Sequence, residues 1–244
     1  DKVAFLSFIV EKPSLAHFPN EIARLSSLKA LQIPVQFLPL SEEQLPKHLI
    51  SLTLDNLSRE EEQAGKHYSW NPLVKMENLE CLRILGDDNG DLLGISPEIA
   101  PNLKWIEVEL FNPNTIHIIK EFKCLEAAIL GEVGNVDIFE HLKHLNLKIV
   151  SAKSPKKGFD YTNISYFKGL EIARLFSIKE EIDCAMFLDF PYLKELLLYN
   201  CKKLKNVETF LEMPVLKSLN IEDAKGVSKE LKASLKEHIP QCEV

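Results

Sequence analysis

One six-residue pattern recurs along this chain and constrains its fold more than any single residue does. The pattern is Leu-x-x-Leu-x-Leu, with other apolar residues at some leucine positions, and its clearest copies are LECLRI (79–84), LKHLNL (142–147), LKELLL (193–198) and LKSLNI (216–221). All of its copies begin at Val3, Leu28, Leu49, Leu79, Leu103, Leu125, Leu142, Leu170, Leu193, Leu216 and Ile239. These starts are 25, 21, 30, 24, 22, 17, 28, 23, 23 and 23 residues apart, and such a period predicts a stack of repeats, each of which forms one coil.

Within one copy, the leucines alternate with other residues as they would in a short β-strand. In the copy that begins at Leu193, alternation places Leu196 and Leu198 on one face of the strand. The other face then carries Glu195, Leu197 and Tyr199. A single strand cannot bury its leucines, so the copies must stack as parallel strands over one continuous core. We therefore expect a sheet of parallel strands that runs through the whole protein.

On these motifs, the sequence resembles the leucine-rich-repeat family over its whole length. The resemblance implies a curved α/β solenoid, with a parallel β-sheet on its concave face and short helices, 3-10 turns and loops on its convex face. Residues 1–244 are then expected to form a single domain of about ten to eleven repeats. Family members often carry an asparagine five residues after the second conserved leucine, where this chain has Leu57, Asp87, Phe111, Val133, Val150, Ile178, Cys201 and Ala224. This departure is typical of an irregular, bacterial-like or intracellular member.

Both ends of the chain differ from the repeats between them. Near the C-terminus, apolar residues recur at four-residue spacing, at Val227, Leu231, Leu235 and Ile239. This spacing predicts an amphipathic helix over about 227–238, capped by Ser228 or Asp223, and a last short strand over 239–244. Together these elements (223–244) would cover the open end of the core. At the N-terminus, the apolar segment VAFLSFIV (3–10) is expected to be a capping strand.

Composition excludes several classes of partner and location. No apolar run reaches the roughly 18 residues that a membrane span needs, so we expect a soluble protein. A net charge of -7 argues against nucleic acid as a partner, because such binding needs clustered Lys and Arg, and it favours a basic protein partner. The cysteines are scattered, without the paired clusters that close extracellular relatives, at Cys81, Cys124, Cys184, Cys201 and Cys242. This distribution favours a reducing, cytoplasmic location.

Three groups of residues could carry chemistry, and each has a simpler interpretation. DDNGD (87–91) has oxygen ligands at alternating positions, but it lacks the later glutamate of a calcium loop and its Asn-Gly pair favours a solvated turn. His141 and His144 are too few to hold zinc, and in the strand expected there they point in opposite directions. Cys81 is predicted to lie beside Arg83, where a lowered thiol pKa would suit a nucleophile, although an incidental surface thiol is favoured. We therefore expect no enzyme activity, no metal and no cofactor.

Two segments make their coils longer than the others. They are SREEEQAGKHYSWNP (58–72) and KIVSAKSPKKGFDYTNIS (148–165). Insertions in solenoids often gather on the binding face. These segments are therefore alternative binding elements, or else surface loops without a partner.

The residues that alternate with the buried leucines are expected to face solvent on the concave side. The candidate partner-binding residues among them are Arg83, Trp105, Glu107, Glu109, Ile129, Arg174, Phe176, Glu195 and Tyr199. Aromatic residues and arginine are enriched in interface hot spots, so this set indicates protein recognition. The alternatives are an error of register, which would present core residues as surface residues, or loops that cover these residues.

The sequence thus favours a non-enzymatic protein–protein interaction module. Within that class, an acidic repeat protein suits an immunity protein that inhibits a toxin, by analogy with the ribonuclease-inhibitor branch of the family. An effector or adaptor that recruits a host or signalling protein is the second interpretation. A cysteine-dependent enzyme is a third, from a different class.

Overall fold

The computed structural model describes residues 3–8, 18–37, 45–55, 75–85, 94–223 and 227–244. They belong to two compact units, which we call unit 1 (Asp1–Leu125) and unit 2 (Glu126–Val244). Segment 58–72 and the DDNGD motif at 87–91 lie outside the described residues. In the part of the chain that is described, no helix is both long and apolar enough to cross a membrane.

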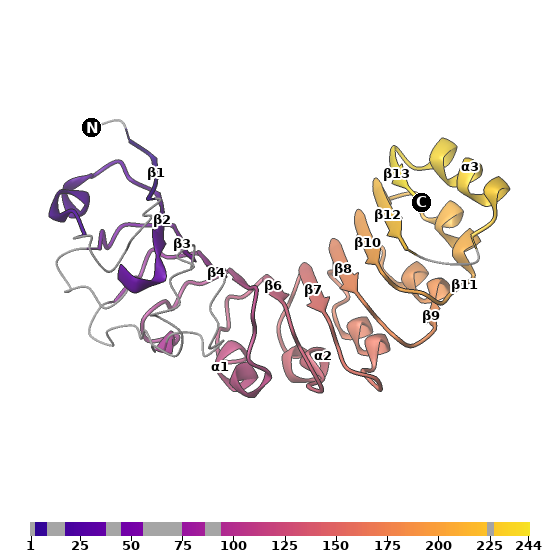
Figure 1. Ribbon diagram of the computed structural model, residues 1–244, viewed down its shortest axis with the longest axis horizontal. Helices are drawn as coiled ribbons and strands as arrows, with labels where there is room; N and C mark the ends of the chain where they lie inside the picture. The colour runs from indigo at the N-terminus through magenta and orange to yellow at the C-terminus, as the bar shows by residue number, and fades with distance from the viewer. Residues whose placement is uncertain (1–2, 9–17, 38–44, 56–74, 86–93, 224–226) are drawn as a thin grey trace, which may run out of the picture. The chain divides into compact units, whose positions relative to one another are not determined.

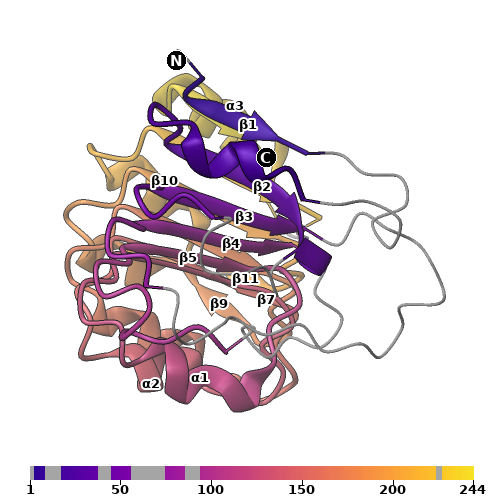
Figure 2. The same cartoon turned by 90° about the vertical axis from the view of Figure 1, so that its left-hand side faces the viewer.

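Unit 1 consists of short parallel strands that follow one another in chain order (Figure 2). They are β1 (Phe5–Ser7), β2 (Ala30–Pro34), β3 (Ser51–Asp55), β4 (Cys81–Leu85) and β5 (Trp105–Val108). Equivalent leucines of the motif pair across neighbouring strands, as Leu31 with Leu52 and Leu52 with Leu82 do. The helical segments of unit 1 are η2 (Asn20–Arg24), η3 (Val35–Phe37), η6 (Pro113–Thr115) and α1 (Ile116–Ile119).

Unit 2 repeats the same arrangement (Figure 1). Its parallel strands are β6 (Ala127–Leu130), β7 (Ile149–Lys153), β8 (Ile172–Phe176), β10 (Glu195–Tyr199), β12 (Ser218–Glu222) and β13 (Gln241–Glu243). Helical segments return the chain between strands, as α2 (Ile138–Leu142), η7 (Tyr161–Tyr166), η8 (Cys184–Asp189) and η9 (Val207–Glu212). Two of the returning segments also pair with each other, through β9 (Ile182–Asp183) and β11 (Leu204–Lys205). The α/β leucine-rich-repeat solenoid expected from the sequence is therefore confirmed.

The core is a column of apolar side chains from the inward faces of the strands. Leu196 and Leu198 are 2% and 0% exposed, whereas Leu197 between them is partly exposed, as the alternation predicted. Phenylalanines from the returning segments fill the space behind the strands. The ring of Phe139 lies 5.4 Å from that of Phe159 and 5.9 Å from that of Phe167. Stacking coils thus gives each apolar side chain a partner in the next coil.

One copy of the motif is placed differently from the prediction. Residues 142–147 do not form a strand, because Leu142 ends helix α2, whose first turn is capped by the Asp137 carboxylate. The strand of this coil is β7, so its motif begins at Leu147, 22 residues after Leu125 and 23 before Leu170. Leu142, Leu145 and Leu147 are all buried, so leucine spacing alone could not distinguish the turn from the strand. Segment 148–165 is consequently an ordinary coil with β7 and η7, and the prediction of an insertion there was wrong.

The strands of unit 2 end in residues with left-handed backbone. Their φ angles lie between 54° and 59°, at Glu132, Ser154, Ser177, Asn200 and Asp223. This geometry lets the amide of Ser177 donate to the carbonyl of Tyr199 at 2.8 Å, and that of Asn200 to Glu222 at 2.9 Å. Nearby, Cys201 occupies the position of the family's asparagine, and its thiol lies 3.5 Å from the carbonyl oxygen of Leu175. Backbone hydrogen bonds therefore connect successive coils here without the asparagines that the family often carries.

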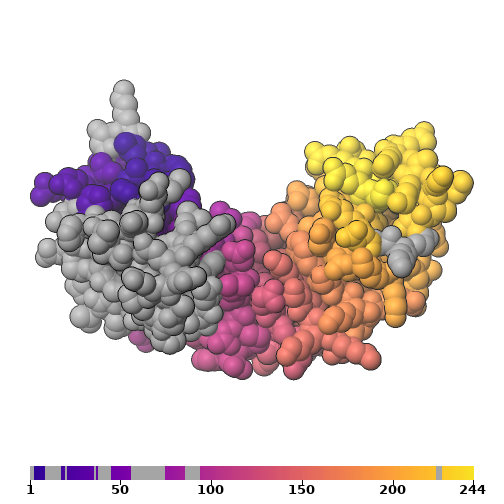
Figure 3. Space-filling view, in the orientation of Figure 1, coloured from indigo at the N-terminus to yellow at the C-terminus, as the bar shows by residue number. Residues whose placement is uncertain are grey.

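The helix and the strand predicted near the C-terminus are present, and their residues appear in yellow in Figure 3. There α3 (Lys229–His238) is followed by β13, and the Ser228 hydroxyl accepts from the amide of Leu231 at 3.1 Å. Leu235 and Ile239 are buried beneath the helix, as the apolar spacing predicted. At the N-terminus, β1 forms the first strand of unit 1 and pairs with β2. Residues 9 and 10 of the expected capping strand lie outside the described residues.

Candidate protein-binding surface

The outward side chains of the strands form a strand face in each unit, opposite to the core. Of the predicted partner-binding residues, Arg83, Trp105, Glu107 and Glu109 belong to unit 1, and Ile129, Arg174, Phe176, Glu195 and Tyr199 belong to unit 2. The alternating burial of the strands confirms that these side chains point away from the core. The two groups differ in how many of their polar side chains already form hydrogen bonds or ion pairs within the described residues.

The strand face of unit 1 contains an internal ion pair. Arg83 Nε lies 2.7 Å from Glu107 Oε2, and Arg83 Nη2 lies 3.3 Å from Glu107 Oε1. The hydrogen bond to Glu107 raises the pKa of Arg83 and outweighs the opposing effect of burial. Beside this pair, Gln32 donates to the carboxylate of Asp55 at 2.6 Å. These polar side chains of unit 1 therefore bind one another across neighbouring strands.

Trp105 and Glu109 sit at the two ends of β5. Trp105 is partly exposed, and its indole N–H is buried with no acceptor among the described residues. Glu109 follows the last residue of β5 and is exposed, while its amide donates to the carbonyl of Ile84 at 3.0 Å. Trp105 pairs in register with Cys81 of the preceding strand. These positions complete the strand face of unit 1 as predicted.

The strand face of unit 2 is more apolar. Register between its strands places equivalent side chains in three rows, which are Ile149–Ile172–Glu195, Ile129–Ser151–Arg174–Leu197–Asn220 and Lys153–Phe176–Tyr199–Glu222. The rings of Phe176 and Tyr199 lie 5.9 Å apart, and Tyr199 is 40% exposed. Neighbouring strands are about 4.8 Å apart, so side chains in one row are in reach of each other. Ile172, Phe176, Leu197 and Tyr199 thus form one apolar group at the middle strands of unit 2, in which Tyr199 is exposed and the other three are partly exposed.

Arg174 lies in the middle of this apolar group. Along β8 it stands between Ile172 and Phe176, and its register neighbours are Ser151 and Leu197. Its side chain is only partly exposed, and it forms no hydrogen bond or ion pair with another residue that the structure describes. Arg174 therefore differs from Arg83, whose guanidinium is already held by a carboxylate.

Charge is distributed unevenly over the strand face of unit 2. The basic residues Lys153 and Arg174 lie on β7 and β8. Exposed carboxylates lie on the later strands, at Glu195, Glu222 and Glu243. Asn220 donates to Glu243 at 3.0 Å, and its own side-chain oxygen is buried without a donor among the described residues. A partner that covers this face thus meets positive charge on one side and negative charge on the other.

The motif error had a direct effect on the site prediction. A motif that begins at Leu142 would place His144 and Asn146 on the outward face, but they lie in the turn before β7. Ile149 and Lys153 were missed, although both belong to the outward face of β7. The signal that could have found them is the regular interval of 22 to 23 residues, which requires a motif at Leu147.

The groups considered for catalysis or metal binding do not form a reactive centre in the described residues. No cluster of three or more His, Cys, Asp or Glu there could hold a metal ion. Burial raises the pKa of the Cys81 thiol, which is opposite to the lowered pKa considered for a nucleophile. Burial also raises the pKa of Cys184, to about 12. These thiols are therefore protonated at neutral pH.

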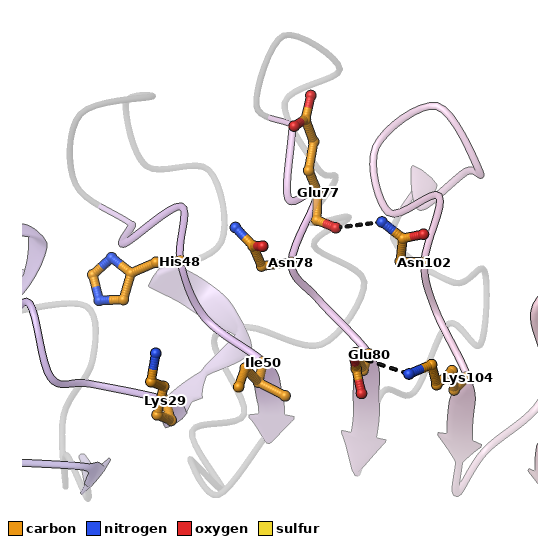
Figure 4. Close-up of a pocket in the computed structure, with 8 residues that line it drawn as sticks. All are labelled: Lys29, His48, Ile50, Glu77, Asn78, Glu80, Asn102 and Lys104. Carbon is orange, nitrogen blue, oxygen red and sulfur yellow. Dashed lines mark hydrogen bonds and ion pairs between the residues drawn. The ribbon is translucent and has the colours of Figure 1, made fainter.

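A shallow hollow of about 320 Å³ lies on unit 1 where the chain enters its strands (Figure 4). Mostly polar residues that come just before or just after the motif leucines line it. Asn102 donates to the carbonyl of Glu77 at 2.8 Å, and His48 Nε2 lies 3.0 Å from the carbonyl oxygen of Leu25. Lys104 and Glu80 form an ion pair at 3.0 Å. These groups connect successive coils, so the hollow is explained by the stacking of unit 1.

Comparison with known proteins adds two structural relatives. No protein-family model and no curated protein sequence matches this chain. Among solved structures, an internalin of Listeria monocytogenes aligns with 92% of this chain and 69% of its own, at 14% sequence identity and a TM-score of 0.46. A leucine-rich-repeat protein of Leptospira interrogans aligns with 94% of this chain and 81% of its own, at 14% identity and a TM-score of 0.30. The repeat architecture of this chain is given by the register of its own strands.

Proposed function

We propose that this chain is a non-enzymatic protein-recognition module whose binding surface is the strand face of unit 2. The observation that carries the proposal is the partly exposed apolar group of Ile172, Phe176, Leu197 and Tyr199 around Arg174, which has no partner among the described residues. Exposed apolar groups of this kind mark interaction sites, and aromatic residues and arginine dominate interface hot spots. Glu195 and Ile129 lie at the edges of this group and would form part of the polar and apolar rim.

Unit 1 ranks second as a candidate binding surface, because most polar side chains on its strand face are already paired. A partner that covers Arg83 and Glu107 would bury an ion pair that is already formed. The hydration that both charges lose on burial offsets their stronger attraction, so the partner gains little binding energy from this pair. Trp105 offers more, because its indole N–H has no acceptor among the residues that the structure describes. We therefore rank Trp105, Glu107 and Glu109 as a second candidate surface, on unit 1 alone.

Within protein recognition, inhibition of a toxin is the function we favour. An inhibitor of this kind acts by covering its target, so it needs a binding surface and no reactive group, and the raised pKa values of Cys81 and Cys184 agree with that. The net charge of -7 suits a basic target at long range. An effector or adaptor that recruits a protein through the same surface is the second candidate. A toxin gene beside the gene for this chain, and loss of toxicity on co-expression, would separate the two.

The test uses the partner captured from native cells by the full chain. Phe176→Ala and Tyr199→Ala should each weaken binding of that partner by at least about 2 kcal/mol, because hot-spot side chains are buried only in the complex. The matched control is Tyr192→Ala, since Tyr192 is 60% exposed but lies in the turn before β10, off the strand face. It should leave the dissociation constant unchanged. Binding that depends on Tyr192 and not on Phe176 would move the site to the flank of unit 2 and refute the proposal.

A further inference from the structure

We infer that the partner segment on this surface carries an aspartate or glutamate carboxylate that pairs with Arg174, with apolar side chains on both sides of it. The inference rests on the proposed function and names the chemistry of the partner. It differs from the expectation of a basic partner that the net charge alone suggests.

The comparison of two equivalent arginines carries the inference. Arg83 and Arg174 both stand four residues after the leucine that opens their motif. In the next coil, the residue in register with Arg83 is Glu107, which holds its guanidinium. The residue in register with Arg174 is Leu197, and on its other side the neighbour is Ser151. Arg174 thus has the position of a paired arginine but no carboxylate within the described chain to pair with.

Burial by a partner would make this lack of a carboxylate costly. A guanidinium has five N–H donors and keeps its charge at all ordinary pH values. A protein that packs on Ile172, Phe176 and Leu197 removes water from Arg174, and a buried charge without a counter-charge is strongly unfavourable. The partner must therefore supply an acceptor at this place. A carboxylate fits best, because it accepts two parallel N–H bonds from the guanidinium.

The surroundings of Arg174 favour a protein carboxylate over a phosphate-rich partner. The apolar side chains on each side need apolar side chains opposite them, which a polypeptide has and a nucleic-acid backbone lacks. The same face also carries Glu195 and Glu222, which repel a polyanion. We therefore expect an acidic residue at the centre of the contact and basic residues opposite Glu195 and Glu222.

The experiment selects binding peptides from a random library displayed on phage, with the full chain as bait. The probe for all titrations is the most enriched peptide, labelled with a fluorophore. We expect Asp or Glu flanked by aromatic or aliphatic residues among the enriched peptides. Arg174→Met keeps the aliphatic stem and removes the charge, so it should weaken binding of the probe roughly tenfold to a hundredfold. Arg174→Lys should also weaken it, because lysine cannot form the paired bonds.

Two controls isolate the pairing itself. Lys168→Met removes an exposed cation in the turn before β8, off the strand face, and it should change the dissociation constant less than about threefold. Changing the acidic residue of the probe to its amide should weaken binding to the unaltered chain as much as Arg174→Met does. The two changes together should cost little more than either alone, because they remove the same contact. Melting curves of each variant verify that its fold is kept.

The outcomes distinguish the inference from the function on which it rests. Probes that lack a carboxylate, or whose binding is unchanged by Arg174→Met, overturn the inference but leave the surface in place if Phe176→Ala still abolishes binding. Probes that bind equally to Phe176→Ala and Tyr199→Ala overturn the proposed surface as well. A library that yields no enriched peptide also counts against the proposed function.

Discussion

Three consecutive leucines on β10 allow the assignment of inward and outward side chains to be tested within one strand. Leu198 is 0% exposed and lies in register between Leu175 and Ile221, which are also buried. Leu198→Ala would leave a cavity bounded on both sides by neighbouring strands, which cannot collapse without breaking their register. We therefore expect it to lower the free energy of unfolding by about 3 to 5 kcal/mol, in the upper part of the usual range for Leu→Ala.

The matched control is the same substitution one residue earlier. Leu197 is partly exposed on the strand face, so Leu197→Ala removes side-chain atoms that are in part already in contact with water. It should cost under about 1 kcal/mol, and Glu195→Ala at the exposed start of the strand under about 0.5 kcal/mol. Leu196→Ala, at a site that is 2% exposed, should again cost about 2 to 5 kcal/mol. Residue type and strand are constant in this series of leucines, so only the direction of the side chain varies.

The assay is urea unfolding of each variant, followed by far-ultraviolet circular dichroism and by tryptophan fluorescence. The m-value should stay constant while the midpoint shifts. Both tryptophans, Trp70 and Trp105, belong to unit 1, whereas the substitutions are in unit 2. Because the repeat continues past Leu125, we propose that residues 1–244 unfold as one domain. In that case Leu198→Ala in unit 2 should also shift the unfolding transition that the tryptophans of unit 1 report. Equal losses for Leu197→Ala and Leu198→Ala would refute the inward and outward assignment. A fluorescence transition that does not move would refute the single domain.

Four further predictions concern the C-terminal helix, the turns and the cysteine thiols. Ser228→Ala should cost about 0.5 to 2 kcal/mol, seen as faster amide exchange in α3, because the amide of Leu231 loses its acceptor. Ser154→Gly should raise the free energy of unfolding by up to about 1 kcal/mol, seen as a higher melting temperature, because glycine adopts the left-handed backbone of Ser154 without strain. Ser154→Val should lower the melting temperature. A Gly variant that is less stable would contradict the strain at this turn. Burial raises the pKa of Cys184 from 9.0 to about 12, so the thiol loses its proton at lower pH in the unfolded chain than in the folded one. The free energy of unfolding should therefore fall as the pH rises from 9.0 to about 12. Cys184→Ala should make this fall with pH less steep. At neutral pH, a thiol reagent should modify the exposed Cys124 and reach Cys184 only after denaturant is added; early labelling of Cys184 would show that its burial is incorrect.

The sequence alone determined the parts of the fold that are set by local spacing. The alternation of Leu196 and Leu198 with their neighbours gave the face of the strand, because the two-residue period of a strand is a property of its own backbone. The C-terminal cap was predictable for the same reason, since the four-residue spacing and Ser228 act within one helix. The prediction failed at 142–147, where Leu142, Leu145 and Leu147 are all buried but lie at the end of a helix, in a turn and just before a strand.

Tertiary structure decided which side chains on the strand face have a partner. Arg83 and Arg174 occupy the same place in the motifs LECLRI and LEIARL, so local sequence does not distinguish them. Glu107 neutralises the first, and Leu197 stands beside the second, in each case from the next coil along the chain. An ion pair requires two charged atoms a few ångströms apart, and that distance is fixed by the register between coils, which only the folded solenoid establishes.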